Sequence, residues 1–316
     1  MMPEADLWPP NDTWAYHDWH ADGGGRVAPF VASMEGQYGP PSGLADFVRK
    51  AQMMNYAGHR AMFEGFNAHL WEPNSGRLLW MSQPAWPSMS WQLFSHDYDT
   101  HGAYFGAKKA CEPVHVQLNL PDLVTMVVNN TTSPLKDLTL TARVFALDAQ
   151  PILSRNAVIL AGPNMAVSAF PLDLPKEAAE GVSFVKLELR DAQGGLLSDN
   201  FYWHAGQSSS LRALNDLPEA PVAVTTAGKQ EGDGLHIVVE VSHPGPGIAL
   251  MNKLTLRRAN GGPRVLPAYA ADNYFSLVPG ERRRIEIICP AGAADGDLEI
   301  ALEGWNARPA VVRVQK

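Results

Sequence analysis

The sequence predicts an α/β barrel remnant, the last part of a TIM barrel, followed by two all-β immunoglobulin-like sandwiches. One observation is the stretch from residue 78 to residue 115, which reads as a buried strand, an aromatic-rich loop, a short helix and a run of strands. That order is typical of the last βα unit of a barrel where it joins a β-sandwich. The other observation is a change in composition, since seven of the nine tryptophans lie at or before Trp91 and 18 of the 28 aromatic residues precede residue 106. Short alternating runs of Val, Leu and Thr follow residue 113, which places the main domain boundary there.

The first predicted domain covers residues 1–113. Its opening 43 residues have many turn-forming residues and little periodicity, although their aromatic side chains must pack on something. Helical spacing of Phe47 and Met54 then indicates a helix. The predicted elements are a helix from an N-cap at Ser42 to about residue 66, a strand over 77–81 and a helix over 103–110. A single strand between two helices cannot close a sheet. We therefore expect this segment to dock on the sandwiches or to need partners outside this chain.

The second and third predicted domains cover residues 114–206 and 207–316. Candidate strands recur in both at the spacing of roughly 8–12 residues that is typical of sandwiches. Seven are expected in the first domain, at 114–120, 123–129, 137–147, 153–161, 165–171, 182–190 and 196–204. The second has eight candidates, one more than a sandwich of the same kind needs, after a linker at 205–217: 221–228, 234–243, 246–258, 263–270, 273–278, 281–288, 297–303 and 309–315.

The composition is that of an ordinary globular protein, with 46% hydrophobic and 18% charged residues over a length of 316. A net charge of −8 and a pI near 5.7 argue against nucleic acid or an anionic membrane as a partner. No signal-peptide pattern opens the sequence, and the cellular compartment stays unknown. Cys111 and Cys289 are expected to be two free buried thiols. No motif predicts a cofactor.

Several segments of the chain form recognisable motifs. The first two are Leu79-Trp-Met81 with Ala85-Trp-Pro-Ser88, and Gly102-Ala-Tyr-Phe-Gly-Ala-Lys-Lys-Ala-Cys-Glu-Pro-Val-His-Val116. Further segments are Asp199-Asn-Phe-Tyr-Trp203, Ala271-Asp-Asn-Tyr-Phe275 and Leu277-Val-Pro-Gly-Glu281. These segments extend over almost the whole chain, which resembles the C-terminal portion of a glycoside hydrolase family 2 enzyme, in the branch of exo-β-D-glucosaminidases and β-mannosidases.

The resemblance implies a (β/α)8 barrel that continues upstream of Met1, with Trp80 on its eighth strand. The two catalytic glutamates of that family lie on the fourth and seventh barrel strands, which would both lie upstream. A retaining glycosidase needs two carboxyl groups about 5 Å apart. We find no surrogate pair: Glu35 and Glu64 have the most apolar surroundings, and Glu64 is more simply a helix-surface or loop-anchoring residue. The resemblance therefore implies no catalytic residue in this chain.

Four side chains are candidates for contact with a β-linked carbohydrate. Trp86 follows the strand, where barrel loops carry active-site groups, and its indole can stack on a pyranose ring. Its alternative role is packing between barrel and sandwich, which we favour for Trp80 and Trp91. Gln83 can bond a hydroxyl, although family members often carry Asn there. The remaining candidates are Trp14 and Tyr16, in an aromatic loop whose simplest role is packing.

The histidines of His17-Asp-Trp-His20 have a spacing compatible with metal ligands, but two histidines without a third ligand do not predict a metal site. Three interpretations of the whole chain remain. The first is a catalytic-chain segment that hydrolyses nothing alone and works with the upstream barrel portion. The second is a non-catalytic carbohydrate-binding or scaffold protein. The third is a truncated or mis-started gene product, since Met1-Met2 lies inside a matching segment.

Overall fold

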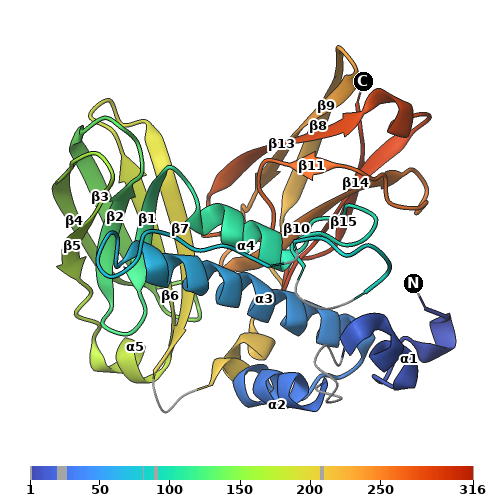
Figure 1. The fold of residues 1–316 in the computed structure, drawn as a ribbon, viewed down its shortest axis with the longest axis horizontal. Helices are drawn as coiled ribbons and strands as arrows, with labels where there is room; N and C mark the ends of the chain where they lie inside the picture. The colour runs from blue at the N-terminus through green and yellow to red at the C-terminus, as the bar shows by residue number, and fades with distance from the viewer. Residues whose placement is uncertain (1, 20–26, 81, 89–91, 207–209, 316) are drawn as a thin grey trace. The chain divides into compact units, whose positions relative to one another are not determined.

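The structure is a computed structural model that describes residues 2–19, 27–80, 82–88, 92–206 and 210–315 (Figure 1). The chain forms two compact units. Unit 1 consists of Met1–Met54, Trp80–Phe105 and Asn215–Lys316, and unit 2 of Asn55–Leu79 and Gly106–Leu214. Each unit therefore combines one set of strands with part of the first 113 residues. Among the described residues, no helix is both long and apolar enough to cross a membrane.

Unit 2 holds seven antiparallel strands in two sheets, with the orders β4-β3-β6-β7 and β1-β2-β5. The strands are β1 (Val114–Asn119), β2 (Val124–Asn129), β3 (Leu135–Phe145), β4 (Pro151–Ala161), β5 (Met165–Pro171), β6 (Val182–Arg190) and β7 (Leu196–Ala205). A short helix, α5 (Lys176–Glu180), precedes β6. All seven strands expected in this region are confirmed.

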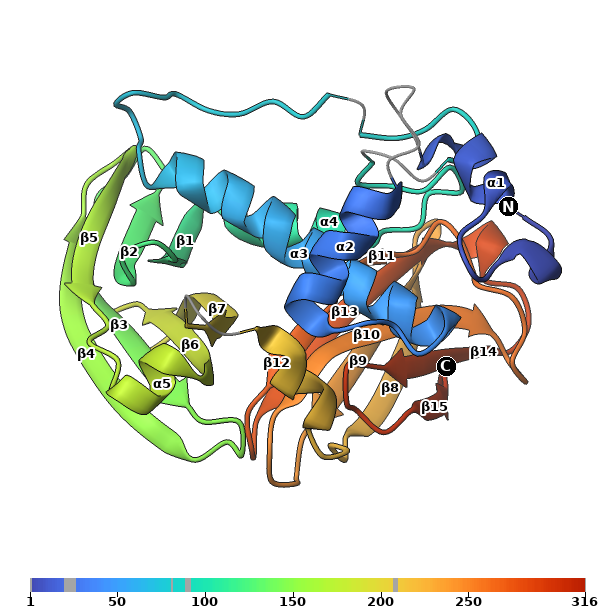
Figure 2. The ribbon, with the colours of Figure 1, turned by 90° about the horizontal axis from the view of Figure 1, so that it is seen from below.

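The alternation of β3 explains why unit 2 is a sandwich. Leu138, Leu140, Ala142 and Val144 occupy every second position of β3, and all four are buried. Because successive strand residues point to opposite faces, this face must be covered. The core that covers it contains side chains from both sheets, including Val116 of β1. Figure 2 shows these strands from a second direction.

Unit 1 holds eight strands, also in two antiparallel sheets, with the orders β12-β10-β14-β15 and β11-β13-β9-β8. They are β8 (Ala223–Glu231), β9 (Gly234–Ser242), β10 (Ala249–Arg258), β11 (Tyr269–Ala270), β12 (Phe275–Leu277), β13 (Arg282–Pro290), β14 (Leu298–Glu303) and β15 (Ala310–Arg313). One hydrophobic core takes side chains from both sheets. The eight expected strands are confirmed, although β11 is much shorter than predicted.

Cys289 is free and buried in this core, whereas Cys111 is free but exposed, contrary to expectation.

The helices lie mainly in the first 110 residues. They are η1 (Glu4–Asp6), α1 (Asp12–Trp14), η2 (Ala15–Trp19), α2 (Val27–Tyr38), α3 (Leu44–Asn67) and α4 (Gly102–Ala110), and short 3-10 turns η3 (Leu211–Asp216) and η4 (Ala291–Ala293) follow later. The helices predicted over 42–66 and 103–110 are confirmed. The first begins at Leu44, one residue later than an N-cap at Ser42 would place it, and the backbone N–H of Ser42 donates to the Asp46 carboxylate at 2.9 Å. Helix α2 was not predicted, because residues 1–43 were expected to be rich in loops on account of their turn-forming residues and low periodicity.

The strand predicted over 77–81 is wrong for the part that the structure describes. Residues 77–80 form no strand, and the side chains of Leu78 and Trp80 are 95% and 81% exposed. Packing of Trp80 in a core was also expected, and its exposure contradicts that. The physical reason is that a strand needs a hydrogen-bonded neighbour, and residues 77–80 pair with none of the described strands. Trp91 lies outside the described residues.

Candidate functional site

Three aromatic rings of unit 1 form a partly exposed cluster. Tyr16 and His17 lie on η2, and Trp86 lies in the segment of residues 82–88. The Trp86 ring stacks on the His17 ring with centroids 5.4 Å apart and planes 27° apart. Tyr16 meets Trp86 edge-on at 5.5 Å. Since Tyr16 is 71% and Trp86 37% exposed, the cluster presents aromatic surface to solvent.

His17 links the two chain segments that form this cluster. Its ring is only 7% exposed, and its Nδ1 lies 2.6 Å from the Pro87 carbonyl oxygen. Because a carbonyl oxygen can only accept, Nδ1 carries the hydrogen and donates. The bond joins η2 to the residue next to Trp86, so the Trp86 ring is fixed by contacts on two sides. Sequence reasoning had given His17 only a weak metal-ligand role, and nothing in the spacing of the histidines marks it as an aromatic partner.

The other two residues predicted from the sequence, Trp14 and Gln83, are not part of this aromatic cluster. Trp14 is buried: its Nε1 donates to the Asp6 carbonyl at 2.9 Å, and its ring packs edge-on against Phe47 at 5.6 Å. Gln83 is exposed. The structure thus brings Tyr16 and Trp86 together, and it places Trp14 in the packing beside η2.

In the part of the chain that the structure describes, no group of three or more His, Cys, Asp or Glu side chains could hold a metal ion. His20 lies outside the described residues. The Nδ1 of His17 is already used by a backbone carbonyl.

The segment that carries Trp86 is closed at its base by backbone hydrogen bonds. The N–H groups of Leu93 and Phe94 donate to the Ser82 carbonyl at 2.9 and 3.1 Å. Ser82 and Leu93, on either side of Trp86 in the sequence, therefore lie close together, and segments with close ends often carry functional side chains.

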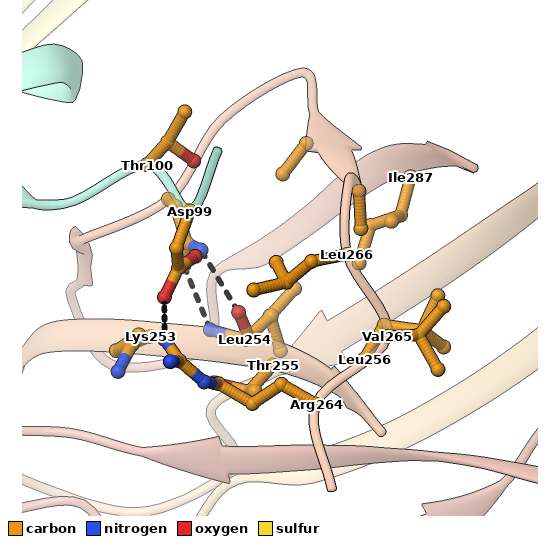
Figure 3. A pocket seen from close by; sticks show the side chains of 13 residues that line it. Asp99, Thr100, Lys253, Leu254, Thr255, Leu256, Arg264, Val265, Leu266 and Ile287 are labelled. Atoms are coloured by element: carbon orange, nitrogen blue, oxygen red, sulfur yellow. Dashed lines mark hydrogen bonds and ion pairs between the residues drawn. The ribbon is translucent and has the colours of Figure 1, made fainter. Parts of the chain in front are cut away.

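The residues just after this loop are anchored on the sandwich of unit 1. The Arg264 guanidinium pairs with Asp99 and lies 3.1 Å from Asp97. Figure 3 shows Asp99 and Arg264 beside a cavity of about 20 Å³, which has room for one water molecule. Burial opposes ionisation of Asp97, but the Ser95 hydroxyl and then Arg264 hold the pKa of its carboxyl below the ordinary value. Sequence analysis missed this anchor, because the partners lie far apart in the chain.

Glu64, considered above as a surrogate catalytic carboxylate, lies in a buried polar network of unit 2. Its Oε1 accepts hydrogen bonds from the Tyr202 hydroxyl at 2.7 Å, the Asn200 amide at 2.8 Å and the His115 Nε2 at 3.1 Å. The Arg60 Nε lies 3.9 Å from Oε2. Glu64 is 4% exposed, so the expectation of a helix-surface residue is wrong, whereas an anchoring role is consistent with these contacts.

The network continues from His115 to a second carboxylate. The His115 Nδ1 lies 3.2 Å from Glu112, which also accepts from the Ser198 hydroxyl at 2.6 Å. Complete burial opposes charge on His115, but hydrogen bonds and attraction from Glu112 and Glu64 dominate, and the pKa of His115 is raised. Both ring nitrogens of His115 therefore face a carboxylate oxygen, one of Glu112 and one of Glu64. Glu64 thus faces His115 as well as Arg60 inside unit 2.

Comparisons with known proteins match both sandwiches to domains of one group of enzymes. Residues 122–205 match the mannosidase Ig/CBM-like domain, and residues 200–307 match the exo-β-D-glucosaminidase Ig-fold domain. The two matched ranges include most strands of both sandwiches. The sheets described above are therefore those of immunoglobulin-like domains.

Curated relatives match almost the entire chain. An exo-β-D-glucosaminidase of Streptomyces avermitilis is 31% identical over 97% of this chain and 37% of its own length. A mannosylglycoprotein endo-β-mannosidase of Lilium longiflorum is 29% identical over 94% of this chain and 37% of its own length. The chain thus spans less than two fifths of these relatives, in their C-terminal part.

Solved structures give the same result. The exo-chitosanase of Amycolatopsis orientalis superposes with a TM-score of 0.89 at 27% identity, over 99% of this chain and 40% of that chain. A β-D-mannosidase of Dictyoglomus thermophilum superposes with a TM-score of 0.75 at 17% identity, which shows a shared fold. A single-residue variant of the Amycolatopsis enzyme has also been solved in complex with PNP-β-D-glucosamine.

Proposed function

Because this chain belongs to the branch of glycoside hydrolase family 2 that holds exo-β-D-glucosaminidases and β-mannosidases, we propose that it is the C-terminal segment of a retaining exo-β-glycosidase. Its substrates would be β-glucosaminides or β-mannosides. In this proposal residues 1–113 are the last part of a TIM barrel, and residues 114–206 and 207–316 are two structural sandwiches. The sequence and structure matches with the relatives support this proposal, because they extend over all three parts of this chain.

The observation that carries a role in sugar binding is the cluster of Tyr16, His17 and Trp86. A pyranose ring presents C–H groups on its faces, and these pack well on an exposed indole. Trp86 offers such a face, and Tyr16 offers a hydroxyl beside it. In the proposal Gln83 donates to or accepts from a sugar hydroxyl. Trp14 directly precedes η2, and in the proposal its packing holds η2 in place.

The proposal assigns no catalytic carboxylate to this chain. A retaining enzyme needs a proton-donating carboxyl and a free nucleophilic carboxylate about 5 Å apart. Glu64 is unsuited to either role, because three donors already occupy its Oε1 and it has almost no exposed surface. We therefore expect the isolated chain to bind sugar weakly and to hydrolyse none.

A direct test combines binding and turnover by the purified chain. Saturation-transfer NMR with glucosamine, mannose and galactose reports binding, and a panel of aryl β-glycosides (glucosaminide, mannoside, galactoside and glucuronide) reports hydrolysis. We expect a transfer signal with glucosamine or mannose that Trp86→Ala abolishes. Trp71→Ala is the matched control, since Trp71 is a half-exposed tryptophan of unit 2 outside the cluster.

Each outcome decides between the interpretations. Hydrolysis of any aryl glycoside would contradict the proposal and would direct attention to Glu35. Sugar binding that Trp86→Ala leaves unchanged would remove the aromatic cluster as the site and would favour a carbohydrate-binding role for the sandwiches. Binding that depends on Trp86 without hydrolysis is the expected result.

A further inference from the structure

We propose that Asn260 is a site of spontaneous deamidation, and that its conversion to isoaspartate releases the Arg264 anchor from Asp97 and Asp99. The inference goes beyond the proposed function and does not depend on it, because it concerns the chemistry of one turn of unit 1 and is tested without sugar. The modification needs only water as a reactant.

The first argument is the sequence Asn260-Gly261, which is the only Asn-Gly pair in the chain. In deamidation, the backbone nitrogen of the following residue attacks the side-chain carbonyl carbon of the asparagine. A side chain on that following residue obstructs the attack, and glycine has none. Asn260 therefore has the least hindered neighbour of all the asparagines in the sequence.

The reaction balances with water alone. The Gly261 nitrogen loses its proton to a solvent base and forms a bond to Cγ of Asn260, while the bond from Cγ to the side-chain nitrogen breaks. That nitrogen takes up a proton and leaves as ammonia. Water then opens the succinimide ring at either carbonyl, which gives aspartate or isoaspartate. In isoaspartate the main chain runs through the side-chain carbons and is longer by a methylene group.

The second argument is the place of this pair in the fold. Asn260 and Gly261 are exposed, with φ angles of 62° and 71°, so water and base reach the reacting atoms. They lie in a tight turn, because Arg257 before it and Arg264 after it form an antiparallel bridge. The position of Arg264 therefore depends on the geometry of the turn.

The third argument is that Glu299 of β14 clamps the backbone of the turn. Its carboxylate is 4% exposed and accepts the N–H groups of Asn260 and Gly261 at 3.0 and 3.1 Å. It also accepts the Arg257 Nε at 2.7 Å, and the Arg313 guanidinium donates to the Asn260 Oδ1 at 2.8 Å. A carboxylate beside the Gly261 N–H opposes loss of its proton, because a second negative charge would develop there. The clamp should therefore slow deamidation in the folded chain.

Isoaspartate at position 260 would break this clamp. The added methylene group moves the two N–H groups away from the Glu299 oxygens, and a buried acceptor that loses its donors is costly. The new carboxylate also adds a negative charge to a turn already held by one. The turn must rearrange, and Arg264 then loses its fixed position beside Asp97 and Asp99.

The test follows the modification by peptide mapping with mass spectrometry while the folded chain is incubated at mildly alkaline pH. Fragmentation by electron transfer distinguishes isoaspartate from aspartate. We expect conversion at Asn260. Asn164 is an internal control, because it is also exposed with a positive φ of 49° but precedes Met165. It should convert at least about tenfold more slowly, since Met165 has the obstructing side chain that glycine lacks.

Two variants test the clamp. Glu299→Gln preserves the size of the side chain but removes its charge. It should accelerate conversion of Asn260 by about tenfold or more, because an adjacent charge commonly shifts a proton-loss equilibrium by at least that factor. Glu303→Gln is the matched control, because Glu303 also lies on β14 and pairs with a cation, Lys253, at 3.1 Å, but is exposed. Its rate should equal that of the wild type, and melting temperatures verify that both variants are folded.

Hydrogen exchange measures the effect on the anchored segment. The N–H of Ser95 donates to the Asp99 carbonyl at 3.0 Å, and the N–H of Asp99 donates to the Ser95 hydroxyl at 3.1 Å. In protein enriched in isoaspartate at position 260, these two amides should exchange about tenfold faster, as in local opening. The amides of β3, in unit 2, should exchange at the same rate before and after the modification.

Conversion of Asn260 only in urea, and never in the folded chain, overturns the proposal. Conversion of Asn164 at the same rate as Asn260 does so too. A Glu299→Gln variant that reacts no faster than Glu303→Gln refutes the clamp. Unchanged exchange at Ser95 and Asp99 after complete conversion refutes the release of Arg264.

Discussion

The guanidinium of Arg264 is paired with the carboxylate of Asp99, which lies 165 positions earlier in the chain. The same guanidinium lies 3.1 Å from Asp97. The backbone just before these two carboxylates donates two hydrogen bonds to Ser82. Arg264 therefore restrains the base of the loop that carries Trp86, although it lies on the sandwich and not in the aromatic cluster.

We predict that Arg264→Ala loosens this loop at small cost to global stability. The side chain is 48% exposed, and exposed ion pairs contribute about 0–1 kcal/mol. Hydrogen exchange at residues 92–100 should become faster, and sugar affinity at Trp86 should fall. Arg308→Ala, which removes an exposed pair with Glu219, is the control. Equal exchange rates in the two variants would refute a positioning role for Arg264.

Glu64→Gln should be among the most destabilising single changes in unit 2. The substitution preserves the size of the side chain but removes the negative charge that faces Arg60 and His115. Breaking a buried ion pair by removal of one partner costs about 3–5 kcal/mol, because the other charge stays buried. Urea unfolding monitored by circular dichroism measures the loss.

The control for that substitution is Glu231→Gln. Glu231 also pairs with a cation, at 2.7 Å from Lys229, but on the surface. Its removal should leave the free energy of unfolding almost unchanged, because solvent screens an exposed ion pair. A Glu64→Gln variant as stable as Glu231→Gln would mean that the buried network contributes little.

The sandwiches could be predicted because their signal is local. In β3 the alternation of Leu138, Leu140, Ala142 and Val144 is visible in seven consecutive residues, and the structure buries that face. The buried role of Glu64 had no such signal, since its partners His115 and Tyr202 lie 51 and 138 positions away.

The candidate site was predictable only in part, for the same reason. Aromatic residues drew attention to Tyr16 and Trp86, and the structure places their rings in contact. The burial of Trp14 depends on Phe47, a residue of another helix. The predicted strand over 77–81 failed because an apolar run indicates a strand only where a neighbouring strand exists to pair with it.

The stability of unit 2 should depend on the protonation of His115. Its pKa is raised in the folded state above the ordinary histidine value of 6.5, because Glu112 and Glu64 outweigh the effect of burial. A raised folded pKa means that the contribution is complete below about pH 6.5 and is lost as the pH rises through the folded pKa. We expect the urea midpoint of the wild type to fall as the pH is raised from 6.5 toward 9.

Other groups in unit 2 respond in different pH ranges. The pKa values of His59 and His204 are lowered by burial, so their effect is a loss of stability as the pH falls below 6.5. The pKa of Glu112 is lowered because His115 and Lys109 outweigh burial, and its contribution is lost as the pH falls below 4.5. The comparison is therefore made against His115→Asn, whose midpoint should be flat above pH 6.5. A parallel decline in both proteins would assign the dependence to another group.

Close packing between α3 and α4 predicts opposite effects for two glycine substitutions. A Cβ at Gly106 would lie 2.2 Å from the Tyr56 carbonyl oxygen, which is backbone and cannot rotate away. Gly106→Ala should therefore force the helices apart and cost about 1–3 kcal/mol, as overpacking does. Gly58 lies inside α3 with open space around its Cβ position, so Gly58→Ala should stabilise by about 0.5–1 kcal/mol through helix propensity. Urea unfolding of both variants distinguishes the cases, and a stabilising Gly106→Ala would mean that α4 does not pack on α3 at the distance described.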